Sequence, residues 1–140
     1  MQTITVIQML TDEVKDDMAK IKVFPVATCS ADGEPNMNMV GLLKVIDDGT
    51  VWLVDNFMDK TLANVMENPR ASFVVWSADT KGAWQVKGDV KVVNSGEDYE
   101  KAQEWAHSIR DTLPAKNLLV MSVTDIYNVK SGPDAGKRIV

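Results

Sequence analysis

Thiol and imidazole side chains are scarce in this chain, which has 1 cysteine and 1 histidine among its 140 residues. A single cysteine, Cys29, excludes an intramolecular disulfide framework and a cysteine-rich zinc site. A single histidine, His107, argues against a histidine metal cluster and against a Ser–His–Asp triad. We therefore expect no metal site and no triad-based hydrolytic activity.

A basic net charge and long apolar runs are also missing. The 15 Lys and Arg residues are outnumbered by 20 Asp and Glu residues, which leaves a net charge of −5 and no basic face for nucleic acid. No apolar run approaches the roughly 18 residues of a membrane-spanning helix. Acidic residues from Asp12 onward interrupt any secretory signal. We expect one cytoplasmic domain over residues 1–140 that binds neither nucleic acid nor a membrane.

The residues that are present form short apolar segments separated by turn signals. Apolar positions at helical spacing predict an N-terminal helix over about 11–21, a second helix over 60–68 and a longer one that begins near Ser95. The segment 131–140 is a Gly/Pro-rich tail without predicted regular structure. Six segments read as strands, over 23–29, 36–46, 50–54, 71–76, 83–93 and 118–129.

Hairpin signals dominate the connections between the predicted strands. Asp32-Gly33 and Asp48-Gly49 each join two strands directly. Six strands joined mostly by hairpins, with helices at the periphery, predict a mainly β (α+β) chain that forms a small antiparallel barrel or sandwich. The Gly-rich Rossmann fingerprint and the Walker loop are absent, so neither device can bind a nucleotide here.

The connector 55–61 carries the chemistry of a phosphate site. A strand ends at Val54, and Lys60 and Thr61 open the next helix. Free backbone N–H groups and a partial positive charge mark the start of a helix, and here a cation and a hydroxyl donor join them. The alternative is that Asp59 or Thr61 only caps the helix while Lys60 points into solvent.

Two strands offer side chains that suit a flat aromatic ligand. Asn38 is a polar residue in an otherwise apolar strand, and Gly41 allows close approach of a ligand. Met37 and Met39 are polarisable, although strand methionines also serve as ordinary core residues. On the fifth predicted strand, Trp84 and Gln85 point to opposite faces.

Five segments follow one another in the chain: ATCSADGEPN at 27–36, GLLK at 41–44, DNFMDKTLAN at 55–64, ENP at 67–69 and QVKG at 85–88. Their order and spacing resemble the pyridoxamine 5′-phosphate oxidase-like FMN-binding split barrels, and most closely their small flavoprotein branch. The resemblance covers about 23–129. It implies a six-stranded antiparallel split β-barrel, a homodimer, and FMN at the dimer interface.

The resemblance also assigns site residues. It places the flavin phosphate on Lys60 and Thr61, which are the residues that the helix-start argument selects. The remaining flavin contacts that it implies are Asn38, Met39, Val40, Gly41, Asp55, Asn56, Phe57, Trp84 and Gln85.

This chain departs from true pyridoxamine-phosphate oxidases at three places. It has Lys60-Thr61 where they carry Arg-Lys, it has Met39 where they carry an arginine, and it lacks their C-terminal Arg and His residues. Oxidation of vitamin B6 is therefore not expected.

The sequence leaves three functions open. The first is an FMN-dependent oxidoreductase or electron carrier that works with NAD(P)H or a protein redox partner. The second is a module that binds flavin or another cofactor without turnover. The third is a structural dimer. Apolar faces at 51–54 and 73–76 favour a homodimer in each case.

Overall fold

The computed structural model describes residues 9–140, and the first 8 residues of the predicted domain lie outside the described part. All strand pairs are antiparallel, and seven strands form one sheet in the order β2-β1-β5-β6-β7-β4-β3. The strands are β1 Phe24–Cys29, β2 Pro35–Val40, β3 Leu43–Asp47, β4 Thr50–Asp55, β5 Arg70–Val75, β6 Trp84–Val93 and β7 Asn117–Asn128. The helices are α1 Asp12–Met18, α2 Lys60–Glu67 and α3 Glu97–Ile109.

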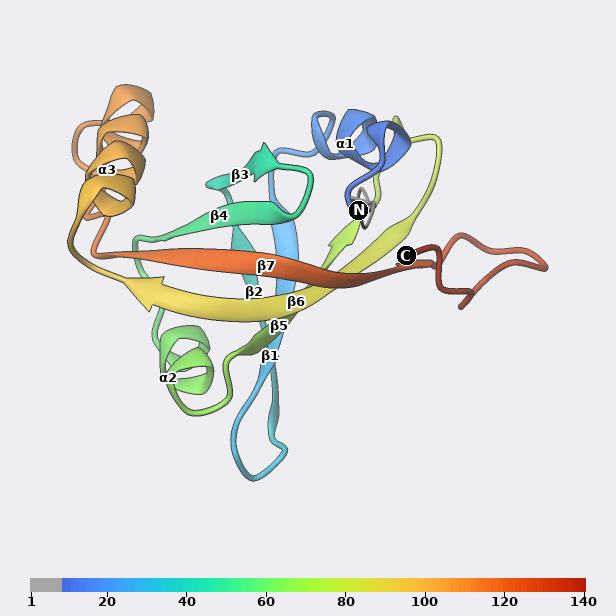
Figure 1. The fold of residues 1–140 in the computed structure, drawn as a ribbon, viewed down its shortest axis with the longest axis horizontal. Coiled ribbons are helices and arrows are strands. Elements are labelled where there is room, and N and C mark those ends of the chain that lie inside the picture. Colours follow the sequence, from blue (N-terminus) through green and yellow to red (C-terminus); the bar gives the residue numbers. More distant parts are fainter. Residues whose placement is uncertain (1–8) are drawn as a thin grey trace, which may run out of the picture.

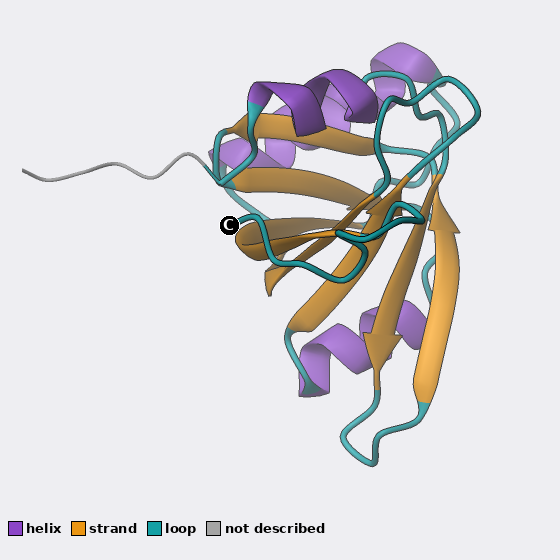
Figure 2. Ribbon diagram, turned by 90° about the vertical axis from the view of Figure 1, so that its right-hand side faces the viewer, coloured by secondary structure: helices purple, strands orange, loops and turns teal. Residues whose placement is uncertain are grey.

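The sheet is coiled into a split barrel, so that strands at its two edges cross at a steep angle (Figure 2). Alternating residues point inward, as in β1, where Phe24, Val26 and Thr28 are buried. The main core fills the barrel and includes the fully buried Phe73, Leu53, Met121 and Ile126. The prediction of a mainly β antiparallel barrel with peripheral helices is confirmed.

The strand count differs from the prediction, because the segment 36–46 forms two strands rather than one. The chain pairs with β1 up to Val40, which lies opposite Phe24. It then pairs with β4 from Leu43, which lies opposite Leu53. Gly41 and Leu42 carry the chain from one edge of the sheet to the other. The apolar pattern continues across this step, so nothing in the local sequence marks the break.

Both faces of β4 are covered by this chain itself. Val51 and Leu53 point into the barrel core, whereas Trp52 and Val54 pack under α3 against Ala102. Figure 1 shows α3 and α2 at the same end of the long strands β6 and β7, away from the C-terminus. The prediction that the apolar face at 51–54 is left over for a dimer contact is therefore wrong for β4.

The N-terminal helix is shorter than the sequence predicts, and the C-terminal tail is more ordered. Thr11 caps α1 by accepting a hydrogen bond from Val14 N, but the helix ends at Met18 and two tight turns reach Ile21. The tail folds back on β7, where Ile139 N donates to Ile126 O and Ile126 N donates to Val140 O. Among the described residues, no helix is long and apolar enough to cross a membrane.

Candidate functional site

A cavity of about 280 Å³ opens where β2, the β4–α2 connector and the α3–β7 loop meet. Most of the residues that line it have apolar side chains. Arg110 is the one charged side chain that lines it among the described residues. The lining residues are Asn38, Met39, Val40, Gly41, Leu42, Val54, Asn56, Phe57, Met58, Arg110 and Leu113.

A second cavity, of about 200 Å³, lies at the start of α2. Its lining is polar and includes a cation, a hydroxyl group and two amides. Asn38 and Phe57 line both cavities, so the two adjoin. The lining residues are Asn36, Met37, Asn38, Phe57, Asp59, Lys60 and Thr61.

The first turn of α2 presents free donors to the second cavity. The first helical hydrogen bond runs from Ala63 N to Asp59 O, so the preceding N–H groups have no acceptor within the helix. The Asp59 side chain makes no capping bond, so Asp59 does not play the capping role that the alternative interpretation gives it. Lys60 is exposed, and its ammonium forms no ion pair with any described residue. This end of α2 thus has the free donors and the cation that an anion site requires.

Thr61 is buried at 2% exposure. Its Oγ1 accepts a hydrogen bond from Asn36 Nδ2 at 3.0 Å. The same amide donates to Thr28 Oγ1, which also accepts from Asn64 Nδ2. This network fastens α2 to β1 and β2. Thr61 still has one hydroxyl proton to donate, and no described residue accepts it.

Asp55 and Asn56 hold the site together. Asp55 is fully buried, and its carboxylate accepts hydrogen bonds from Met58 N at 2.9 Å and Asn117 Nδ2 at 2.8 Å. Asn56 Oδ1 accepts from Ala115 N at 3.0 Å. Both side chains were expected to contact a flavin. The structure instead uses them to clamp the α3–β7 loop onto the connector, although Asn56 also lines the larger cavity.

Other predicted contacts do lie at the cavities. Asn38 Oδ1 accepts from Met39 N, while its Nδ2 has no partner among the described residues. Phe57 is 73% exposed and Met39 is 60% exposed at the cavity mouths. Val40 and Gly41 complete the β2 wall. The structure therefore brings together the predicted residues of the β2 end and of the connector.

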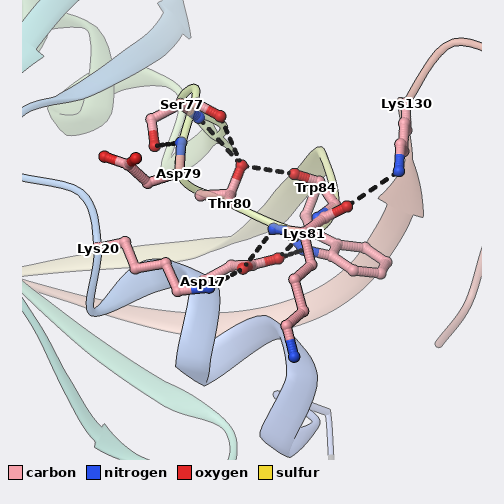
Figure 3. Close-up of polar contacts among 9 residues, drawn as sticks. Asp17, Lys20, Ser77, Asp79, Thr80, Lys81, Trp84 and Lys130 are labelled. Carbon is pink, nitrogen blue, oxygen red and sulfur yellow. Dashed lines mark hydrogen bonds and ion pairs between the residues drawn. The ribbon is translucent and has the colours of Figure 1, made fainter.

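Trp84 and Gln85 lie elsewhere. Trp84 is buried, and its Nε1 donates to Asp17 Oδ2 at 2.9 Å (Figure 3). Burial raises the pKa of Asp17, but hydrogen bonds from Trp84, from the backbone N–H groups of Lys81 and Gly82 and from Lys20 lower it to about 2. Gln85 is half-buried on the opposite, outward face of β6. Trp84 is thus a core residue in this chain rather than part of the cavity wall.

The sequence argument missed Arg110 and Leu113. Both come from the α3–β7 loop, more than fifty residues beyond the connector that they face. Arg110 lies among charged residues at the end of an amphipathic helix, which is typical of solvent exposure. No motif or periodicity could have placed it at the cavity.

The donor set fits a phosphorylated aromatic ligand. A dianion needs a cation and several neutral donors, which Lys60, Thr61 and the α2 N–H groups supply. The adjoining apolar cavity suits a ring system, since such sites are mostly apolar with a few polar groups. No group of three His, Cys, Asp or Glu side chains in the described part of the chain is arranged to hold a metal ion.

Comparisons with known proteins agree with this architecture. An uncharacterized protein of Methanocaldococcus jannaschii is 40% identical over 133 residues, which cover 93% of this chain and 87% of that protein. HupZ of Group A Streptococcus superposes with a TM-score of 0.79 at 28% identity and covers 91% of this chain and 100% of its own.

Two more distant structures share the fold. An FMN-binding protein from Syntrophomonas wolfei has a TM-score of 0.67 at 23% identity and covers 81% of either chain. HutZ, a heme storage protein from Vibrio cholerae, has a TM-score of 0.67 at 15% identity and covers 86% of this chain and 94% of its own. The family model described as pyridoxamine 5′-phosphate oxidase matches residues 10–130. This chain therefore belongs to the pyridoxamine 5′-phosphate oxidase family.

Proposed function

We propose that this protein binds FMN and acts as a flavin-dependent oxidoreductase or electron carrier. The observation that carries the proposal is the pair of adjoining cavities that share Asn38 and Phe57. One cavity offers the donors that a phosphate needs, and the other offers apolar walls beside a strand. Membership of the family supports the same cofactor.

The phosphate end of the site uses three kinds of donor. Lys60 supplies the charge, Thr61 supplies a hydroxyl proton and the first turn of α2 supplies backbone N–H groups. Buried Thr61 is held in place by Asn36. Asp59 is exposed beside this cavity, so its carboxylate must face solvent when the phosphate binds.

The ring end of the site orients the flavin and excludes water. Met39, Val40 and Leu113 provide apolar surface around the larger cavity. FMN, when bound, supplies the redox chemistry. No carboxylate and no histidine among the described residues lines this cavity, so electron or hydride transfer fits it better than proton abstraction.

We also propose a symmetric homodimer formed through the outward face of β2, β1, β5 and β6. On this face Met39 lies opposite Pro25, and Val74 lies opposite Gln85. Met37 is 70% exposed on the same face, and Trp76, directly after β5, is 64% exposed. A second copy would cover these apolar side chains and bring Gln85 toward a site that its own chain does not reach.

The alternative is a module that holds a cofactor without turnover. His107 does not favour haem in that role, because its Nε2 lies 2.9 Å from Leu113 O and is engaged in a hydrogen bond. Bleaching separates the two functions. An oxidoreductase should lose its flavin absorbance with NADH or NADPH, whereas a storage or sensor module should bleach only with dithionite.

The test compares FMN with riboflavin, which lacks the phosphate. Lys60→Ala should weaken FMN binding roughly 10- to 100-fold, because it removes one charge-assisted contact, and should leave riboflavin binding unchanged. Lys91→Ala, at an exposed lysine of β6, is the matched control. If wild type binds both ligands equally, or if Lys60→Ala weakens both equally, the phosphate does not lie at α2 and the proposal fails.

A further inference from the structure

Arg110 is the one charged residue that lines the larger cavity in the described part of the chain, and it forms no ion pair there. It lines the larger cavity with ten uncharged residues. Its guanidinium forms no hydrogen bond or ion pair with any residue of 9–140. A chain of net charge −5 offers many carboxylates, yet none in the described part of the chain forms an ion pair with this group. An unpaired arginine at a ligand cavity suggests that the ligand supplies the negative charge.

The backbone around Arg110 is held in a defined position. Arg110 ends α3 by turning to an extended conformation at φ −154° and ψ 119°, and its N–H donates to Ala106 O. Its carbonyl accepts from Leu113 N at 3.2 Å. The same loop is clamped to the connector by Asn56 and Ala115. The loop that places Arg110 at the cavity wall is therefore anchored at both sides.

We propose that Arg110 compensates the negative charge that the flavin ring gains on reduction and thereby raises the midpoint potential of the bound cofactor. This inference rests on the proposed function. Two electrons and one proton entering the ring, with the proton on N5, leave a negative charge around N1 and the adjacent carbonyl. A guanidinium beside that charge stabilises reduced over oxidised flavin. The phosphate needs no help from Arg110, because Lys60 lines the other cavity.

The proposal predicts a selective effect of Arg110→Gln. Oxidised flavin is neutral in its ring, so its dissociation constant should change less than about threefold. Reduced flavin should bind about tenfold more weakly. For a two-electron couple this lowers the midpoint potential by about 30 mV. The exposed side chain of Arg110 is not part of the core, so the variant should fold.

The experiment measures the midpoint potential by dithionite titration against a reference dye, together with the dissociation constant of oxidised FMN. Arg110→Lys keeps the charge and should retain most of the effect. Lys116→Gln removes an exposed cation of the same loop that does not line the cavity, so it controls for net charge.

Two results overturn the inference while the proposed function stands. One is a wild-type midpoint potential in Arg110→Gln. The other is an equal lowering of the midpoint potential in Arg110→Lys and in Arg110→Gln, which would indicate a steric rather than a charge effect. Failure of wild type to take up FMN overturns both the proposed function and this inference.

Discussion

The carboxylate of Asp17 and the indole of Trp84 are joined by a hydrogen bond of 2.9 Å between residues 67 positions apart. Asp17 also accepts from the N–H groups of Lys81 and Gly82 and from the Lys20 ammonium. Figure 3 shows these donors converging on one side chain. The contact ties α1 to the loop that precedes β6, so a single buried carboxylate joins the N-terminal helix to the barrel.

The first prediction concerns pH. Because the pKa of Asp17 is lowered from 3.8 to about 2, its ionised form stabilises the fold at every pH above the unfolded value. This stabilisation, on the order of 2 kcal/mol, should be lost as the pH falls from about 4 to about 2. Urea denaturation at stepped pH values measures it.

The matched variant is Asp17→Asn. An amide at this position cannot accept from all four donors, and its own N–H₂ group faces them. We expect a loss of about 2–3 kcal/mol at neutral pH, and a weaker acid dependence than wild type between pH 4 and 2. If the stability of the variant fell as steeply as that of wild type between pH 4 and 2, other carboxylates would control the acid transition.

The second prediction concerns the network under α2. Thr28→Val removes the hydroxyl that accepts from both Asn36 and Asn64 and leaves two amides without that partner. The free energy of unfolding should fall by about 2 kcal/mol. Thr112→Val, at an exposed threonine, should fall within about 0.5 kcal/mol of wild type in the same urea titration.

Gly88 provides the third prediction. It follows a register shift in β6, and a Cβ at this position would collide with the Ser122 carbonyl oxygen and press on Met121 at 3.0 Å. Gly88→Ala should cost about 1–3 kcal/mol, because backbone cannot yield as a side chain can. Gly49→Ala, where the nearest atom is 4.0 Å away, is the control. Equal stability of the two variants in thermal melts would contradict the prediction.

The fourth prediction tests the proposed dimer. Trp76→Gln removes a large exposed ring from the outward sheet face without touching either cavity. Sedimentation at micromolar concentration should give a dimer for wild type and a larger monomer fraction for the variant. Met66→Gln, at a 65% exposed methionine of α2, should remain dimeric. A monomeric wild type would exclude this interface.

Several features of the fold and site were predictable from local pattern. Turn residues and alternation identified the strands, and Lys60 and Thr61, selected at the predicted helix start, do line a cavity there. The sequence also grouped the end of β2 with the connector, through a family resemblance that the structure supports.

The remaining features depend on partners that are distant in sequence. The sequence places Asp55 in a loop, but in the structure its carboxylate is buried and accepts a hydrogen bond from Asn117. Trp84 is a ligand contact in the sequence-based interpretation, but in the structure its indole N–H donates to Asp17. Thr61 looks exposed until Asn36 is placed over it. In each case a tertiary hydrogen bond decides the role, and no local periodicity encodes it.

The step at Gly41 and Leu42 has a consequence for amide hydrogen exchange. β2 and β3 are the two edges of the sheet, yet they follow one another in the chain, and both residues of the step line the larger cavity. A ligand seated there would contact the end of β2, this step and the β4–α2 connector. At a hundred times its dissociation constant it would stabilise the folded state by about 2.7 kcal/mol. Exchange along β2 should therefore slow more than exchange in β6, because β2 is an edge strand and its end lines the cavity.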